Sequence, residues 1–149
     1  MKKSNLFCLL VFCCATHFAN AQVSTVTMQA KCGDKFEGEF RVQHEQQEIK
    51  IPLGAGDILE LSIVPLGDYL KIRYQLCDPS GALLVDDYNG MFGNDKKSLE
   101  INTGVLSANG AYTIKIRNDS AYNSNDTMVG VYTVYVKCTK RNGQVIEPE

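Results

Sequence analysis

IKIPLGAGDILELSI, residues 49–63, carries the pattern from which the architecture of this 149-residue chain can be predicted. Apolar residues occupy alternate positions on both sides of a glycine-rich turn, and polar residues such as Glu60 and Ser62 stand between them. The alternating apolar set is Ile49, Ile51 and Leu53 before the turn and Leu59, Leu61 and Ile63 after it. A period of two is typical of β-strands that bury one face. The stretch therefore predicts two strands, each with one side in a hydrophobic core.

The same alternation recurs in short runs between Phe36 and Cys138. The further runs are Phe36 to Val42, Ile72 to Leu76, Leu83 to Val85, Leu99 to Ile101, Tyr112 to Ile116 and Tyr132 to Val136. Turn-forming residues separate the runs, as in DPSG at 78–81 and ANG at 108–110, and no segment sustains a helical period. The sequence therefore predicts an all-β domain of about eight strands, either a sandwich or a barrel.

The first 21 residues are predicted to be a signal peptide. Lys2 and Lys3 precede an apolar run from Leu6 to Cys14, and the triplet Ala19-Asn20-Ala21 is a cleavage site of the A-x-A type. Lipid attachment at Cys13 or Cys14 is the alternative, but the bulky Phe12 stands where a small residue should precede Cys13. We therefore expect a secreted protein, extracellular or periplasmic, that begins at Gln22. No second apolar run approaches the length of a membrane span.

Charge argues against nucleic acid as a partner. Loss of Lys2 and Lys3 with the signal leaves 15 − 2 = 13 basic residues against 17 acidic ones, a net charge of about −4. The expected domain organisation is a signal peptide at 1–21, an N-terminal segment at 22–31, the β-sandwich domain at 32–138 and a polar tail at 139–149.

Three cysteines follow the predicted signal: Cys32, Cys77 and Cys138. Three pairings are possible, and one cysteine must be left over. Cys32 and Cys138 flank the first and last predicted strands, so we expect these two to form the disulfide. Cys77 follows the inward Leu76 and is expected to point away from the core with an accessible thiol.

Several stretches of the sequence, in this order, resemble the bacterial pre-peptidase C-terminal domain, a secreted β-sandwich often appended to exported peptidases. They are CGDKFEGEF (32–40) with IKIPLGAGDILELSIVPLG (49–67), GDYLKIRYQLCDPSGALLVDD (67–87), and LSANGAYTIKIRN (106–118) followed by GVYTVYVKC (130–138). The resemblance implies a single antiparallel β-sandwich, jelly-roll-like, with a mostly non-catalytic role. Related collagenase domains bind collagen and calcium, and their calcium ligands are acidic residues ahead of the first strand. Residues 22–31 contain no Asp or Glu, so that calcium site is not expected here.

Catalysis is not expected from these residues. His44 is the single histidine after the signal and stands in a polar segment, and the sequence contains neither H-E-x-x-H nor G-x-S-x-G. Tyr112 follows Gly110 and Ala111 at the start of a strand, a position typical of a tyrosine corner that serves structure.

A calcium site is one possible function of the polar connection from Asp86 to Lys97. Asp86, Asp87, Asn89, Asn94 and Asp95 place five oxygen-bearing side chains within ten residues, and calcium prefers such ligands. The spacing does not match an EF-hand, and Asp and Asn are also the usual residues of a solvated turn.

A basic and aromatic surface is the other possible site. If the alternation is right, five side chains point outward: Arg73, Lys115, Arg117, Tyr135 and Lys137. In one sheet they would form a platform for an anionic polymer, and otherwise they are an ordinary solvated face.

The sequence therefore predicts a secreted, non-catalytic binding domain for an extracellular or cell-surface polymer or for an exported protein. The alternative is a small exported inhibitor or chaperone-like partner of a peptidase, which would act through a segment such as Tyr88 to Asp95.

Overall fold

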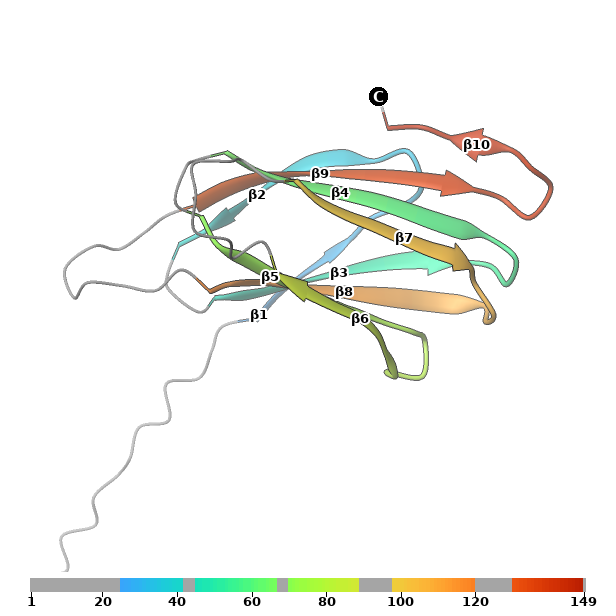
Figure 1. Ribbon diagram of the computed structural model, residues 1–149, viewed down its shortest axis with the longest axis horizontal. Coiled ribbons are helices and arrows are strands. Elements are labelled where there is room, and N and C mark those ends of the chain that lie inside the picture. The colour runs from blue at the N-terminus through green and yellow to red at the C-terminus, as the bar shows by residue number, and fades with distance from the viewer. Residues whose placement is uncertain (1–24, 42–44, 67–69, 89–97, 120–129, 149) are drawn as a thin grey trace, which may run out of the picture.

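The computed structural model describes residues 25–41, 45–66, 70–88, 98–119 and 130–148, apart from the side chain of residue 88. These residues form ten strands and no helix (Figure 1). The strands are β1 Thr25–Gln29, β2 Lys35–Phe40, β3 Gln46–Leu53, β4 Ile58–Leu66, β5 Ile72–Cys77, β6 Leu83–Tyr88, β7 Leu99–Val105, β8 Gly110–Asn118, β9 Gly130–Thr139 and β10 Val145–Ile146. Within the same residues, no helix is present that could cross a membrane.

Two sheets pack face to face and form a sandwich. The first sheet has the order β1-β3-β8-β5-β6, and the second has the order β10-β9-β4-β7, with β2 also paired to β9. Figure 1 shows β9 and β4 of the second sheet above β3 and β8 of the first. All pairs are antiparallel except β1 with β3, which is parallel. The predicted all-β sandwich is confirmed.

Strand alternation builds the core as expected. On β4, Leu59, Leu61 and Ile63 are buried, while Glu60 and Ser62 between them are partly exposed. The other predicted inward residues are also buried: Ile72, Tyr74, Ile114, Ile116, Val134 and Val136. Both sheets therefore contribute one apolar face to a shared interior.

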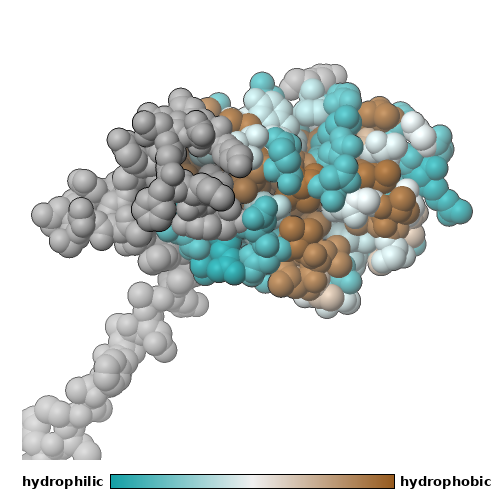
Figure 2. All heavy atoms as spheres, in the orientation of Figure 1, coloured by the Kyte–Doolittle hydropathy of each residue, from teal (hydrophilic) through white to brown (hydrophobic). Residues whose placement is uncertain are grey.

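Some large apolar side chains stay exposed at the edge formed by β6 and β7. Leu83 and Leu84 lie on β6, Val105 ends β7, and Val105 is 71% exposed. Figure 2 shows apolar atoms gathered over these two strands on the face in view. The core is therefore incompletely covered where these two edge strands meet.

Asp57 joins three turns at one end of the sandwich. Its carboxylate accepts hydrogen bonds from the Gly54 N–H (2.9 Å), the Lys140 ammonium (2.8 Å) and the Arg141 N–H (3.1 Å). Its own main chain accepts a hydrogen bond from the Leu106 N–H at 2.8 Å. Burial by itself raises the pKa of Asp57, but the hydrogen bonds outweigh burial and leave the pKa below 3.8. Asp57 therefore ties the end of β7 to the β9–β10 turn.

Tyr112 forms the predicted tyrosine corner. The ring is 1% exposed, and its hydroxyl donates a hydrogen bond to the Ala108 carbonyl at 3.0 Å. The hydroxyl also accepts a longer hydrogen bond of 3.4 Å from the Ala108 N–H. The side chain therefore fixes the connection between β7 and β8, which supports a structural role.

Two strands, β1 and β10, go beyond the eight that the sequence predicted, and in β1 only Val26 and Met28 alternate with polar residues. β1 has exposed or half-buried side chains throughout, and its strand geometry comes from pairing with β3. β10 has two residues and pairs with the end of β9. Among the described strands, the parallel pair of β1 with β3 is the one departure from the antiparallel prediction, since alternation along a strand does not give the direction of the strand beside it.

The cysteine pairing agrees with the prediction, but the third cysteine differs from it. Cys32 and Cys138 form a disulfide with their Cα atoms 5.4 Å apart. Cys77 is free and only 7% exposed, so the expected accessible thiol was wrong. Alternation with Leu76 places Cys77 on the outer side of β5, where Leu83 and Thr113 flank it on the two neighbouring strands. Its neighbours across the sheet, not the core, account for its burial.

Candidate ligand-binding site

Three predicted ligand residues meet on the outer face of the first sheet. Arg73 on β5 lies directly opposite Arg117 on β8, and Lys115, two residues before Arg117, lies opposite Gln75. Their strands bury the intervening apolar residues, so the pleat turns these side chains outward. One end of this face therefore carries three cationic side chains on adjacent strands.

These cations line a small polar pocket. The lining residues are Gln46, Arg73, Gln75, Lys115 and Arg117, and the pocket volume is about 100 Å³. A water molecule takes about 30 Å³ in the liquid, so the pocket has room for one carboxylate, sulfate or phosphate group. Every lining side chain is an amide or a cation, and none is acidic.

Carboxylates at the rim hold both guanidinium groups in place. Arg73 donates from Nε to Asp86 Oδ1 (2.8 Å) and from Nη2 to Oδ2 (2.6 Å). Arg117 donates in the same way to the two oxygens of Asp119, at 2.5 and 2.9 Å. Such two-point pairs fix the plane of a guanidinium. The hydrogen bond from Arg73, assisted by one from Gln75, lowers the pKa of Asp86 to about 2.

Hydrogen-bond donors remain available around the pocket. Within the part of the chain that the structure describes, Lys115 has no carboxylate within ion-pairing distance, and Nη1 of Arg73 and of Arg117 donates no hydrogen bond. The ion pair with Asp86 raises the pKa of Arg73, and the pair with Asp119 raises that of Arg117. Both arginines therefore stay charged, and an anion can approach without displacing the carboxylates.

Tyr135 and Lys137 do not belong to this face, so the predicted five-residue platform was wrong. Both lie on β9 in the second sheet, on the other side of the sandwich. Tyr135 has the Lys35 ammonium 5.3 Å from its ring centre, and Lys137 is paired with Glu60 at 3.0 Å. Alternation fixes the side of a strand to which a residue points, but it does not say which sheet the strand joins.

The pocket also contains two residues that the sequence did not single out, Gln46 and Gln75. Gln46 lies opposite Arg117 on β3, and Gln75 lies opposite Lys115 on β5. An outward glutamine has no distinguishing pattern in a single sequence. Only the pairing of the strands brings these amides beside the cations.

The predicted calcium ligands are described only in part. β6 continues through Asp86 and Asp87, so these two are strand residues with side chains on opposite faces and not neighbours in one loop. Asn89, Asn94 and Asp95 lie outside the described residues, as does His44. Among the described residues, no three His, Cys, Asp or Glu side chains are placed to share a metal ion. Calcium binding stays a prediction, which a rise in melting temperature at millimolar calcium would support.

The architecture is that of a class of small β-sandwich domains that includes the pre-peptidase C-terminal domains. One such domain, from a collagenase of Bacillus anthracis, superposes with a TM-score of 0.51 at 14% sequence identity, over 76% of this chain and 97% of that domain. The predicted resemblance is thus confirmed for the fold. No protein-family model matches the sequence, and no curated protein sequence matches it.

Two further solved structures share the fold. PliG from Aeromonas hydrophila, a periplasmic inhibitor of g-type lysozyme, has a TM-score of 0.51 at 12% identity and covers 77% of this chain and 99% of its own. CorA, a surface-associated copper-binding protein of Methylomicrobium album BG8, has a TM-score of 0.59 at 9% identity, over 76% and 98% of the two chains. At these identities the likeness establishes architecture and leaves function to the site.

Proposed function

We propose that the protein is a non-catalytic, exported binding module whose first sheet holds an anionic group of its partner. The partner is an extracellular or cell-surface polymer, or an exported protein. The observation that carries the proposal is the directly opposed pair of Arg73 and Arg117, which lines one pocket together with Lys115.

The opposed arginines favour anion binding on physical grounds. Like charges directly across an antiparallel pair destabilise a sheet, so such a pair costs stability unless a counter-charge is close. Asp86 and Asp119 supply two counter-charges at the rim, and Lys115 adds a third cation that forms no ion pair among the described residues, although Glu48 lies opposite it on β3. An anion in the pocket would offset this remaining charge. The chain as a whole carries a net charge of −2, so the feature is local.

The same residues argue against catalysis. Amide and fully protonated cationic side chains bind and orient an anion, but they provide neither a nucleophile nor a general base at neutral pH. The structures with this fold include a domain of a collagenase, an inhibitor and a copper-binding surface protein, which supports an extracellular binding role. Because the inhibitor and the copper-binding protein have different targets, the ligand class comes from the pocket and not from the fold.

Retention on anionic columns tests the proposal. We expect the protein beginning at Gln22 to be retained on alginate, dextran sulfate or polyphosphate beads, which carry carboxylate, sulfate and phosphate groups, and to elute as salt rises. Arg73→Gln with Arg117→Gln should abolish retention, and Lys115→Gln should weaken it. Lys50→Gln is the matched control, because Lys50 lies on β3 of the same sheet and does not line the pocket.

Retention that survives the double arginine change on all three supports contradicts the proposal. Melting curves of each variant separate loss of binding from loss of fold. Arg73→Gln and Arg117→Gln each leave a carboxylate at a partly exposed rim, so we expect melting temperatures close to wild type.

Inhibition of an exported enzyme is the second candidate. The observation that favours it is the fold shared with a periplasmic lysozyme inhibitor. Stoichiometric loss of activity of a secreted peptidase or lysozyme on titration with this protein would support inhibition. Inhibition that persists in the arginine double variant would assign it to another surface.

A further inference from the structure

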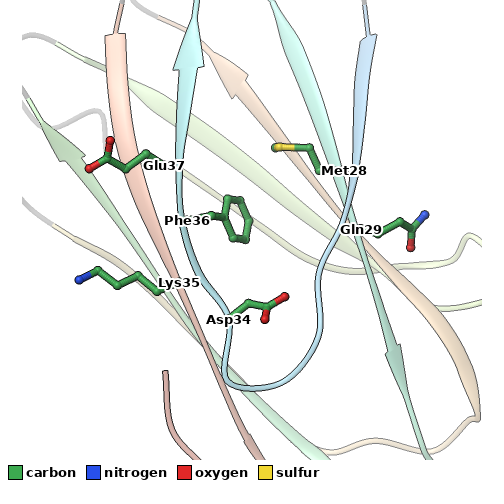
Figure 3. Close-up of a pocket in the computed structure, with 6 residues that line it drawn as sticks. All are labelled: Met28, Gln29, Asp34, Lys35, Phe36 and Glu37. Atoms are coloured by element: carbon green, nitrogen blue, oxygen red, sulfur yellow. The ribbon is translucent and has the colours of Figure 1, made fainter. Parts of the chain in front are cut away.

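A groove separates β1 of the first sheet from β2 of the second, at the edge opposite β6 and β7. Its volume is about 480 Å³, and it is lined by Met28, Gln29, Asp34, Lys35, Phe36 and Glu37. Figure 3 shows Met28 and Phe36 pointing toward each other across the gap, and Asp34 pointing into it from the connecting turn. Lys35 and Glu37 project away on the far side of β2.

The apolar part of the groove is an uncovered part of the interior. Val26 and Met28 lie on the same face of β1, the face turned toward the second sheet, yet Val26 is 44% exposed. Met28 and Phe36 are only partly buried, although both pack against the core. Each of these strands lies at the edge of its sheet, and no described residue fills the space between them.

Asp34 is the one charged group among the labelled side chains that points into the groove. Its Oδ2 accepts a hydrogen bond from the Lys31 N–H at 2.8 Å, and its Oδ1 accepts none from a described residue. The Lys35 ammonium lies near the Tyr135 ring on the outer face of the second sheet, so it is not inside the groove. The groove thus combines an apolar wall, an aromatic ring and a carboxylate, which complements an aliphatic cation.

The turn that carries Asp34 is held in place before any ligand arrives. The Ala30 N–H donates to the Lys50 carbonyl at 3.0 Å, and the Gly33 N–H donates to the Val136 carbonyl at 2.8 Å. The Asp34 carbonyl accepts from the Val136 N–H at 2.9 Å, and the disulfide anchors Cys32 in the same turn. A carboxylate fixed in this way loses little freedom when a ligand binds.

The free edge of β1 indicates how the cation is presented. β3 is the one strand that pairs with β1 among the described residues, so the other side of β1 offers main-chain N–H and C=O groups to an added extended chain. We infer that the groove binds a lysine or arginine side chain carried on an extended segment of a partner protein. The aliphatic stem lies between Met28 and Phe36, and the cationic end reaches Asp34. This site is separate from the anion pocket.

Blocked peptides of the sequence Thr-Val-Xaa-Val-Thr test the inference, with Xaa as lysine, norleucine or glutamate. Norleucine keeps the aliphatic stem of lysine and lacks its charge. Calorimetry should give binding of the lysine peptide, at least about fivefold weaker binding of the norleucine peptide, and no binding of the glutamate peptide. Amide NMR shifts on adding the lysine peptide should centre on residues 25–37.

Asp34→Asn is the decisive variant, because asparagine keeps an oxygen for the Lys31 N–H and removes the charge. It should weaken the lysine peptide about fivefold and leave the norleucine peptide unchanged. Lys35→Gln is the matched control and should change neither, since Lys35 points away from the groove. Equal affinity for the lysine and norleucine peptides overturns the inference, as does lysine-peptide binding that Asp34→Asn does not weaken, or no binding at millimolar peptide. Lys115→Gln should leave peptide binding intact, which separates this site from the anion pocket.

Discussion

The β1–β2 edge and the β6–β7 edge of the sandwich both leave apolar side chains exposed, but the two edges are held in different ways. At the β1–β2 edge the chain crosses between the sheets through one turn, and the disulfide of Cys32 fixes that turn to β9. At the β6–β7 edge, a cavity of about 250 Å³ lies between the strands, and hydrogen bonds fix its surroundings. Tyr112 lines this second cavity and is bonded to Ala108.

This difference shows that an open edge does not have to be weakly held. At the first edge, a disulfide and main-chain hydrogen bonds together hold a carboxylate beside apolar side chains that are only partly buried. The second edge leaves Leu84 and Val105 partly or mostly exposed, and main-chain hydrogen bonds of Leu106 and the Tyr112 hydroxyl hold the β7–β8 connection there. The following changes affect the two edges unequally.

Removal of the disulfide should have the largest effect. Cys32→Ala with Cys138→Ala opens a link across 106 residues, and we expect the free energy of unfolding to fall by about 4 to 5 kcal/mol in the chain-entropy account. Urea denaturation measures the change. Cys77→Ala is the matched control and should cost about 1 kcal/mol. A double variant as stable as the control would show that hydrogen bonds alone hold the β1–β2 edge.

Asp57 ties the end of β7 to the β9–β10 turn, and its substitution should have the next largest effect. Asp57→Asn removes the charge that Lys140 and the Arg141 N–H recognise, and we expect a cost of about 2 kcal/mol at pH 7. The folded-state pKa is lowered, so this stability is present above the unfolded pKa and is lost as pH falls through the folded pKa.

The difference in melting temperature between wild type and Asp57→Asn should therefore shrink as pH falls from about 5 toward 2. A difference that is the same at both pH values would mean that the carboxylate charge contributes nothing at this junction.

Tyr112→Phe should have a smaller effect, confined to the β6–β7 edge. It removes the hydroxyl that bonds the Ala108 carbonyl, at a cost of about 1 kcal/mol. Tyr135→Phe is the control, because the Tyr135 hydroxyl makes no hydrogen bond to a described residue. Hydrogen exchange of the Ala108 amide should accelerate in the first variant alone. An unchanged exchange rate would argue against the tyrosine corner as a support of this edge.

Leu84→Ser and Val105→Ser should have the smallest effect. Leu84 is half exposed and Val105 is mostly exposed, so each substitution should change the free energy of unfolding by less than about 0.5 kcal/mol. Val26→Ser is the matched change at the β1–β2 edge, because Val26 is also an apolar strand residue that is 44% exposed. A loss of about 2 kcal/mol or more at Val105 would mean that this edge is covered in solution.

The sequence predicted local structure well and long-range pairing poorly. Alternation was sufficient for strands such as β4, because Leu59 and Leu61 face the core wherever the strand lies in the sheet. It was not sufficient for Lys137, whose side is set by alternation but whose sheet is set by the pairing of β9 with β4.

The candidate site shows the same difference between local structure, which alternation predicts, and strand pairing, which it does not. Arg73, Lys115 and Arg117 were predicted as outward cations, and the pairing of β5 with β8 makes them neighbours. The groove at β1 could not be predicted, because its free edge exists only once β1 has paired with β3. A site that forms only when two distant segments pair has no recognisable pattern in the sequence of either segment.

The burial of Cys77 bears on how the chain forms the disulfide between Cys32 and Cys138. Exchange between thiols and disulfides requires that a thiolate reach a sulfur atom, and in the finished fold Cys77 is shielded by its neighbours on β6 and β8. Mispaired forms that use Cys77 would have to draw it out of β5, which removes a central strand of the first sheet. Once β5 has paired on both sides, the correct bond is protected from rearrangement. Rearrangement of disulfides among Cys32, Cys77 and Cys138 is therefore confined to the period before β5 pairs with β6 and β8.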